Sequence, residues 1–350
     1  MKIFIPDDIK PSNKNNLFLL VRPFYSDKGW TQFGEKFKNW NLNQIECQLV
    51  SNATCADVLL VPFFINYYFK NHISYLLKEY NDICIKCDIR GFGFISGDYC
   101  EDYPYFEKIT YFRMGGFKSK LGRNNKGFPA ALSDFNKKIN NTTDISIREW
   151  NAKPTVGFCG HATPSKTVYF FQTFKFLLEN IRRFLLDPSR NDYEIYFQSA
   201  NYRYKILKSI ENSNQLNCNY IFREKYRAGA NTDYERKLST LEYYNNIIDS
   251  DYIVCLRGTG NFSIRLYETL MMGRVPIFID TDCLLPFDKN ITWSKHLLVV
   301  KWVDRYNIPE ILIKFHKELT KENFIEMQIH NRELWLKKLQ PSWILNNLVI

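Results

Sequence analysis

Two arginines and a glutamate lie close together in the stretch LRGTGNFSIRLYE, residues 256–268. Guanidinium groups grip phosphate oxygens with two parallel hydrogen bonds, so Arg257 and Arg265 are candidates for neutralising a diphosphate. Glu268 follows Arg265 by three residues and shares its face of the expected helix. A carboxylate at that place suits the two hydroxyls of a ribose. The stretch therefore predicts a nucleotide site.

Small and capping residues separate the two arginines. Gly258 and Gly260 let a backbone approach an anion closely and permit positive φ. Asn261 or Ser263 can cap the helix that follows. In open α/β sheets, ligands bind beyond the carboxyl ends of the strands, where the amino ends of helices point their N–H groups at them. The run DYIVC before the stretch and SIRLYETLMM within and after it supply that strand and that helix.

Other interpretations of the same residues stay open on spacing alone. Arg265 and Glu268 also fit an ordinary surface ion pair, and Gly-x-Gly also fits a plain turn. A dinucleotide-binding fingerprint fits poorly, because Ser263 stands where its third glycine belongs and no early strand carries the motif.

The elements that position this stretch alternate along the second half of the chain. Strand-like runs are TVGFCG, YEIYFQ, NYIF, DYIVCLR, VPIFID and HLLVV, with helical patterns between them. Such alternation indicates a parallel sheet with right-handed crossovers. The first half offers shorter runs, KIFI, LFLLVRPF, ADVLLVPFF, ICIKC, GFGFIS and ITYFRM, which also favour an α/β layer.

At 350 residues, the chain exceeds the usual size of one domain. The polar stretch KKINNTTDISIREWNAKP reads as a boundary. We expect an α/β fold with two facing Rossmann-like domains over residues 1–150 and 151–305, and helices over 306–350 that pack back across both.

The residues after Glu268 resemble the C-terminal signature of the exostosin-like glycosyltransferases. The resemblance is dense over residues 220–303 and thin elsewhere, and Thr269 stands where that family usually has alanine. ADVLLVPFF resembles an element of that family's N-terminal domain. FREKYRAGA, which contains Arg223, together with Arg236 resembles the segment before its donor motif. The matching signature residues are Arg257-Gly258, Phe262-Ser263, Arg265, Glu268, Gly273, Val275-Pro276, Leu285-Pro286-Phe287, Ile291 and Trp293.

This resemblance implies a GT-B fold, with the donor bound on the C-terminal domain and the acceptor mainly on the N-terminal one. It also implies an inverting, metal-independent transfer of a sugar from a nucleotide sugar, usually UDP-linked, to a glycan or polysaccharide. No further cofactor is expected. The donor-binding residues would be Arg223, Arg257, Gly258, Gly260, Asn261, Ser263, Arg265 and Glu268.

An inverting transfer needs a general base near the acceptor hydroxyl. Asp98 follows a predicted strand in ISGDYCEDYPYF, and His161 follows the first strand of the second domain in GFCGHATPSK. Asp57 matches the N-terminal element of the family but also fits a structural cap. All three are candidate bases.

Metal and nucleic-acid roles have weaker support. Cys84-x-x-Cys87 lacks a second pair, and Asp249-x-Asp251 and Asp280-x-Asp282 read as structural, so we expect no metal. Three classes of protein are considered: an enzyme, a non-catalytic relative of the same fold, and a basic nucleic-acid-binding protein. The net charge is +10, but the Lys and Arg residues are scattered among acidic ones, which disfavours the third class. Without a signal-like or membrane-spanning segment, a cytoplasmic protein of bacterial or viral origin is expected.

Overall fold

A computed structural model describes residues 1–7, 16–25, 40, 42, 46–186, 196–224 and 226–348 of the chain. The chain divides into two compact units. Unit 1 comprises Met1–Asp134, Leu284–Phe287 and Leu336–Ile350, and unit 2 comprises Phe135–Cys283 and Asp288–Trp335.

Unit 1 is built on a six-stranded sheet in the order β2-β1-β3-β4-β5-β6, in which every neighbouring pair is parallel. Its core is rich in aromatic side chains, among them Phe18, Phe63 and Phe112. The strands are β1 (Lys2–Phe4), β2 (Gln48–Val50), β3 (Val58–Leu60), β4 (Arg90–Phe94), β5 (Ile109–Arg113) and β6 (Asn125–Gly127). The helices are η2 (Leu19–Tyr25), η3 (Ala53–Cys55), α2 (Ile65–Lys70), α3 (Tyr75–Lys86) and α11 (Pro341–Asn346).

Two strand predictions in unit 1 are wrong. The run ICIKC lies in helix α3 or just after it, where Leu76, Tyr80 and Cys84 recur at helical spacing and are buried. Its alternation of isoleucine and polar residues fits both periods over so short a span. Most of the run LFLLVRPF lies in the 3₁₀ helix η2, in which Pro23 cannot donate a ladder hydrogen bond.

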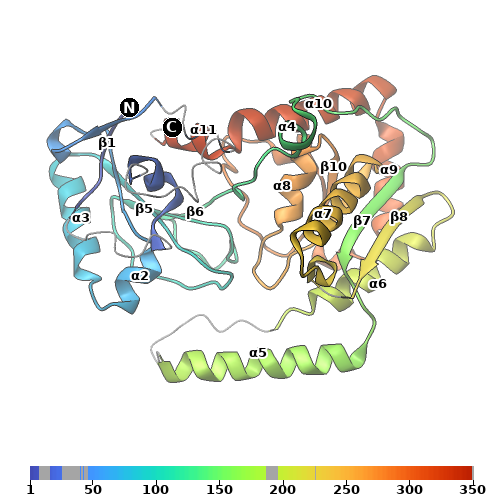
Figure 1. Cartoon of the computed structure of the whole chain (residues 1–350), viewed down its shortest axis with the longest axis horizontal. Helices are drawn as coiled ribbons and strands as arrows, with labels where there is room; N and C mark the ends of the chain where they lie inside the picture. The colour runs from blue at the N-terminus through green and yellow to red at the C-terminus, as the bar shows by residue number, and fades with distance from the viewer. Residues whose placement is uncertain are drawn as a thin grey trace. The chain divides into compact units, whose positions relative to one another are not determined.

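Unit 2 is built on a five-stranded parallel sheet in the order β11-β10-β9-β7-β8, with helices on both faces (Figure 1). The strands are β7 (Thr155–His161), β8 (Asn217–Arg223), β9 (Tyr252–Cys255), β10 (Val275–Asp280) and β11 (Leu298–Lys301). The helices are α4 (Phe135–Asn140), α5 (Lys166–Leu186), α6 (Ser199–Glu211), η4 (Tyr226–Gly229), α7 (Asp233–Ile248), α8 (Ile264–Met271), η5 (Trp293–Lys295), η6 (Trp302–Asp304), α9 (Ile308–Glu318) and α10 (Lys321–Lys338).

Most of the expected elements of unit 2 are present. The exception is YEIYFQ, whose described residues 196–198 are not in a strand, while residues 193–195 lie outside the described part of the chain. The fold class, two Rossmann-like α/β domains with parallel sheets, is confirmed. That the two domains face each other stays a prediction.

The boundary between the units falls after Asp134, earlier than the polar stretch suggested. The reason is that this stretch packs on unit 2. Arg274 donates to the backbone carbonyl and the hydroxyl of Ser146, at 2.9 and 3.1 Å. Arg148 forms an ion pair with buried Asp251. At the other end of the chain, Leu336–Ile350 returns to unit 1, where Ile344 and Leu345 join the core.

Strand order in unit 2 has a consequence for ligand binding. From β7 the chain goes to β8 on one side, whereas from β9 it goes to β10 on the other. The point between β7 and β9 is therefore the switch point of the sheet, beyond whose carboxyl ends open α/β folds bind their ligands. Among the described residues, no helix has the length and hydropathy needed to cross a membrane.

Candidate functional site

The candidate site lies at the carboxyl ends of β7, β8 and β9 in unit 2. His161 and Arg223 end two neighbouring strands and are paired in register. The predicted stretch 256–268 begins where β9 ends and runs into α8. The sequence-predicted residues of unit 2 thus come from three strand ends at one edge of one sheet.

Arg265 extends from α8 across the switch point. Its Nη2 donates to the carbonyl of Cys159 on β7, at 2.8 Å, and its guanidinium lies 4.2 Å from the ring centroid of Phe158. Gly160 makes this approach possible. A Cβ at position 160 would lie 2.8 Å from Nη2 of Arg265, and the backbone there has φ of 157°. The sheet is therefore shaped to hold a guanidinium between β7 and β9.

Arg265 and Glu268 share one partner, which the sequence did not reveal. The hydroxyl of Tyr243, on α7, donates to the carboxylate of Glu268 and accepts from Nε of Arg265 at 3.3 Å. Burial raises the pKa of Glu268, and the contacts with Tyr243 and Arg265 lower it in part. The simple surface ion pair between Arg265 and Glu268 does not describe this half-buried arrangement.

A second guanidinium, also missed from the sequence, lies near the first. Arg203 on α6 donates from Nη2 to the carbonyl of Arg257, at 3.0 Å, and its Nε has no hydrogen-bond partner in the described part of the chain. Burial and the positive charge of Arg265 lower the pKa of Arg203 to about 9. The two half-buried guanidiniums repel each other, and a bound anion between them would relieve that repulsion.

His161 adds a neutral group to this edge. Burial, together with the positive charge of Arg203, lowers the pKa of His161 below its ordinary value. Its imidazole is therefore mostly neutral at pH 7, and it can donate a hydrogen bond from one ring nitrogen and accept one at the other.

The loop after β9 differs in detail from expectation. Neither Gly258 nor Gly260 is among the glycines with positive φ, so they are not required for that conformation. A Cβ on Gly258 would meet no atom within 4 Å, which leaves its backbone open to approach. The buried side chain of Arg257 donates to the carbonyl of Thr259, at 2.7 Å, and lies 4.7 Å from the ring centroid of Phe197. Arg257 thus shapes its own loop.

Three other predicted donor-site residues have internal contacts. The amide of buried Asn261 donates to the carbonyls of Thr281 and Asp282, both at 3.0 Å, so it ties the β9–α8 loop to the loop after β10. Ser263 is the N-cap residue of α8 by backbone conformation, but its hydroxyl makes no capping hydrogen bond. Arg223 forms an ion pair with Glu242 of α7, at 2.6 Å.

The two candidate bases of unit 1 lie at opposite ends of its strands. Asp98 is exposed in the loop that follows the carboxyl end of β4, and partial desolvation raises the pKa of its carboxyl. Asp57 precedes β3, at the amino end, where its carboxylate accepts from the backbone N–H of Lys2 at 2.6 Å. Since ligands of parallel sheets bind beyond the carboxyl ends, this position favours the structural role of Asp57 over that of a base.

The two Asp-x-Asp pairs make structural contacts. Asp251 accepts from Arg148 and from the backbone N–H of Thr155, and Asp280 accepts from the backbone N–H of Cys283 at 3.0 Å. Within the described ranges, no three His, Cys, Asp or Glu side chains gather in a way that could hold a metal ion.

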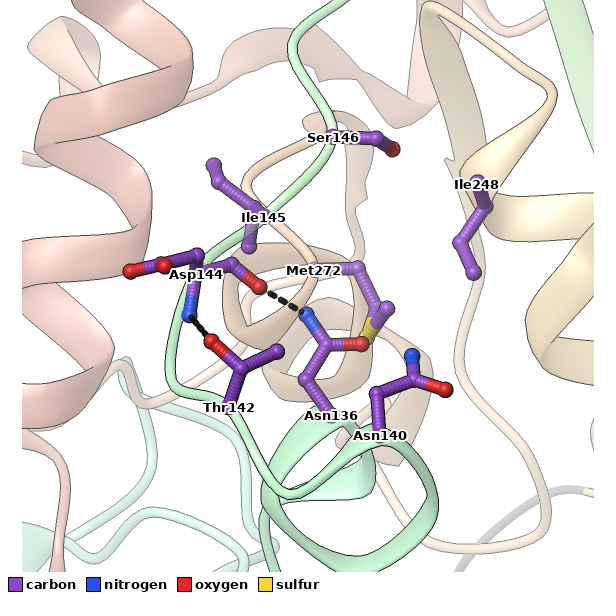
Figure 2. A pocket seen from close by; sticks show the side chains of 8 residues that line it. All are labelled: Asn136, Asn140, Thr142, Asp144, Ile145, Ser146, Ile248 and Met272. Carbon is purple, nitrogen blue, oxygen red and sulfur yellow. Dashed lines mark hydrogen bonds between the residues drawn. The ribbon is translucent and has the colours of Figure 1, made fainter.

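A separate cavity of about 370 Å³ lies elsewhere in unit 2 (Figure 2). Its lining includes Asn136 of α4, whose amide donates to the carbonyl of Asp144 at 2.7 Å. Ile248 and Met272, the residues that precede the loops into β9 and β10, close another side. The cavity is therefore at the amino ends of these strands, away from the arginine cluster formed by Arg203 and Arg265 at the carboxyl ends.

Comparison with known proteins finds relatives among the glycosyltransferases. No protein-family model matches the sequence. Over 92 residues, 26% of the chain, the sequence is 34% identical to the Exostosin-1 homolog of Caenorhabditis elegans. Over 88 residues, 25% of the chain, it is 30% identical to a probable glucuronoxylan glucuronosyltransferase of Arabidopsis thaliana. These matches confirm the resemblance to the exostosin-like glycosyltransferases.

The extent of this similarity is limited. The matches span 23% and 18% of the length of those two relatives. Among solved structures, a glycosyltransferase from Rickettsia africae overlaps 97% of this chain and 82% of its own, with a TM-score of 0.36 and 10% identity. A TM-score and an identity this low carry no argument, so the fold class rests on the two parallel sheets described above.

Proposed function

We propose that this protein is a glycosyltransferase that moves a sugar from a nucleoside-diphosphate donor, UDP-linked by preference, to a glycan or polysaccharide. The observation that carries the proposal is the pair of guanidiniums, Arg203 and Arg265, at the switch point of unit 2. The resemblance to exostosin-like proteins supports the same reaction class.

The chemistry follows from where charge develops. When the bond between the anomeric carbon and the diphosphate breaks, negative charge accumulates on the leaving oxygens, and fixed cations stabilise that charge best. Arg265 is held by Cys159, Phe158 and Tyr243, so little reorganisation is needed during the reaction. The open space beside Gly258 would let a phosphate approach the loop, and the neutral imidazole of His161 would add a hydrogen-bond partner for it.

Nucleoside recognition is assigned to Glu268. Its carboxylate, already oriented by Tyr243, would accept hydrogen bonds from the ribose hydroxyls. In this role Tyr243 is a positioning residue.

We assign the general base to Asp98, an exposed carboxylate in the loop that follows the carboxyl end of β4 in unit 1. Deprotonation of the acceptor hydroxyl and its attack opposite the leaving diphosphate would invert the anomeric centre. Because the cations supply the charge that a metal would otherwise supply, we propose that the transfer needs no divalent metal.

The test is a thermal-shift screen of the full chain against nucleotide sugars, with free UDP and GDP alongside. A ligand that binds the folded state raises Tm by mass action. The donor identified in this way is then incubated with the protein and the release of nucleoside diphosphate is measured. Binding without release, even with a panel of acceptors, would favour the non-catalytic relative. Heparin retention without nucleotide binding would favour a nucleic-acid-binding protein.

A further inference from the structure

Helix α5 presents its apolar side chains to solvent. Phe170, Phe174, Leu177, Leu178, Ile181 and Leu185 recur at the spacing of a single helix face, and each is between 51% and 73% exposed. Figure 1 shows α5 as a long helix lying apart from the sheet of unit 2 and the helices that cover it. In a soluble domain, such a stripe normally faces the core.

The opposite face of α5 carries polar side chains together with Phe176, and it is the face that contacts Tyr196 of unit 2. Gln172 accepts from the hydroxyl of Tyr196, at 2.7 Å, and the ring of Phe176 lies 5.2 Å from that of Tyr196. Arg183, on the same face, is buried. The helix is therefore oriented with its more polar side inward and most of its large apolar side chains outward, which is the reverse of a helix that stabilises a core.

The charges on α5 indicate what covers this face. The helix carries four basic residues and one acidic residue, Glu179, which pairs with Arg182 at 3.3 Å. Helical spacing places Lys175 and Arg182 together along one border of the apolar stripe, and both are exposed. An apolar face rich in Phe and Leu with a basic border is typical of helices that lie in the plane of a membrane interface.

We propose that α5 binds a lipid surface carrying anionic headgroups, with its apolar face among the acyl chains and Lys175 and Arg182 at the headgroups. A second copy of the chain fits less well, because pairing two such faces would bring like-charged borders together. Anionic headgroups instead neutralise them. The inference concerns a surface distinct from the arginine cluster and does not depend on the proposed transfer.

The test is cosedimentation of the full chain with vesicles of phosphatidylcholine alone and of phosphatidylcholine with phosphatidylglycerol. We expect binding to the anionic vesicles that weakens as salt is added. The double variant Phe174→Glu, Ile181→Glu should lower the partition constant at least about tenfold, since burying one such side chain contributes that much or more. Lys175→Glu with Arg182→Glu should abolish the preference for anionic vesicles.

The control is Tyr234→Glu, which changes a side chain of α7 that is 71% exposed and should leave binding unchanged. Sedimentation velocity and thermal melts of the same variants complete the test. Three results would overturn the proposal. They are absence of vesicle binding by the unaltered chain, a dimer that Phe174→Glu, Ile181→Glu dissociates, and a large fall in Tm for that variant, which would show that the face packs within the chain.

Discussion

Replacement of Arg203 by methionine is expected to separate binding from stability. The change removes one of the two guanidiniums proposed to hold the diphosphate. A hydrogen bond between charged groups contributes about 1.5–3 kcal/mol, so Kd for UDP should rise about ten- to a hundredfold. The fold should tolerate the loss, because the folded protein without ligand holds this charge at a cost.

Arg203 contributes to the stability of the unliganded protein in two opposing ways. Burial and the charge of Arg265 lower the pKa of Arg203 to about 9, so the folded state disfavours the charged form. Since the free side chain is charged at pH 7, holding this charge in the folded site destabilises the folded protein at that pH, and Arg203→Met removes that cost. Against it stand hydrogen bonds to the carbonyls of Leu256 and Arg257, each contributing about 1 kcal/mol.

Removal of the desolvated and repelled charge offsets the loss of the two hydrogen bonds, so Tm without ligand should not fall by more than about 3 °C. The assay is isothermal titration calorimetry with UDP, together with differential scanning calorimetry of the unliganded variant. Lys208→Met is the matched control, because Lys208 lies on the same helix as Arg203 and its part-exposed ion pair with Glu211 contributes little, so neither quantity should change. An unchanged Kd for Arg203→Met, or a fall in Tm of roughly ten degrees, would refute the reasoning.

Three further predictions concern Arg265 and Glu268. Glu268→Ala should weaken UDP binding about ten- to a hundredfold with the fold intact by circular dichroism, and an unfolded variant would show that Glu268 is structural. Arg265→Lys keeps the charge but loses the planar fork, so kcat should fall at least about a hundredfold while donor affinity changes much less; unchanged turnover would contradict the assignment. Because burial raises the pKa of Glu268 and its ionised form accepts the ribose hydroxyls, UDP affinity should be full at neutral pH and fall as the carboxyl is protonated in mildly acidic buffer. Calorimetry across that pH range should show Glu268→Gln to have lost this dependence, and an identical profile in both proteins would exclude Glu268 as the titrating group.

The sequence predicted the donor loop better than it predicted what surrounds it. The stretch after β9 joins a strand to a helix as expected, because the apolar run, the glycines and the helical spacing agree with one another. Arg203 and Tyr243 lie in ordinary amphipathic helices, α6 and α7, and nothing in those segments sets them apart from surface residues. Arg203 and Tyr243 come close to Arg265 and Glu268 only because β7 and β9 are neighbours in the sheet. Strand order cannot be predicted from local sequence patterns.

The sequence also did not predict which way an element faces within the fold. The amphipathic pattern of α5 predicts a helix correctly, but a pattern alone does not say which face meets the protein. Asp57 likewise matched a family element, yet its role depends on lying at the amino end rather than the carboxyl end of a strand. Both facts belong to tertiary structure.

The central claim is that a guanidinium pair at the switch point of unit 2 binds a nucleoside diphosphate without metal. Its most direct test is calorimetric titration of the full chain with UDP in the presence of EDTA, repeated for the double variant Arg203→Met, Arg265→Met. The account predicts one binding site in the unaltered protein and no measurable binding in the folded double variant. Binding that requires manganese, or that survives the loss of both arginines, would contradict it.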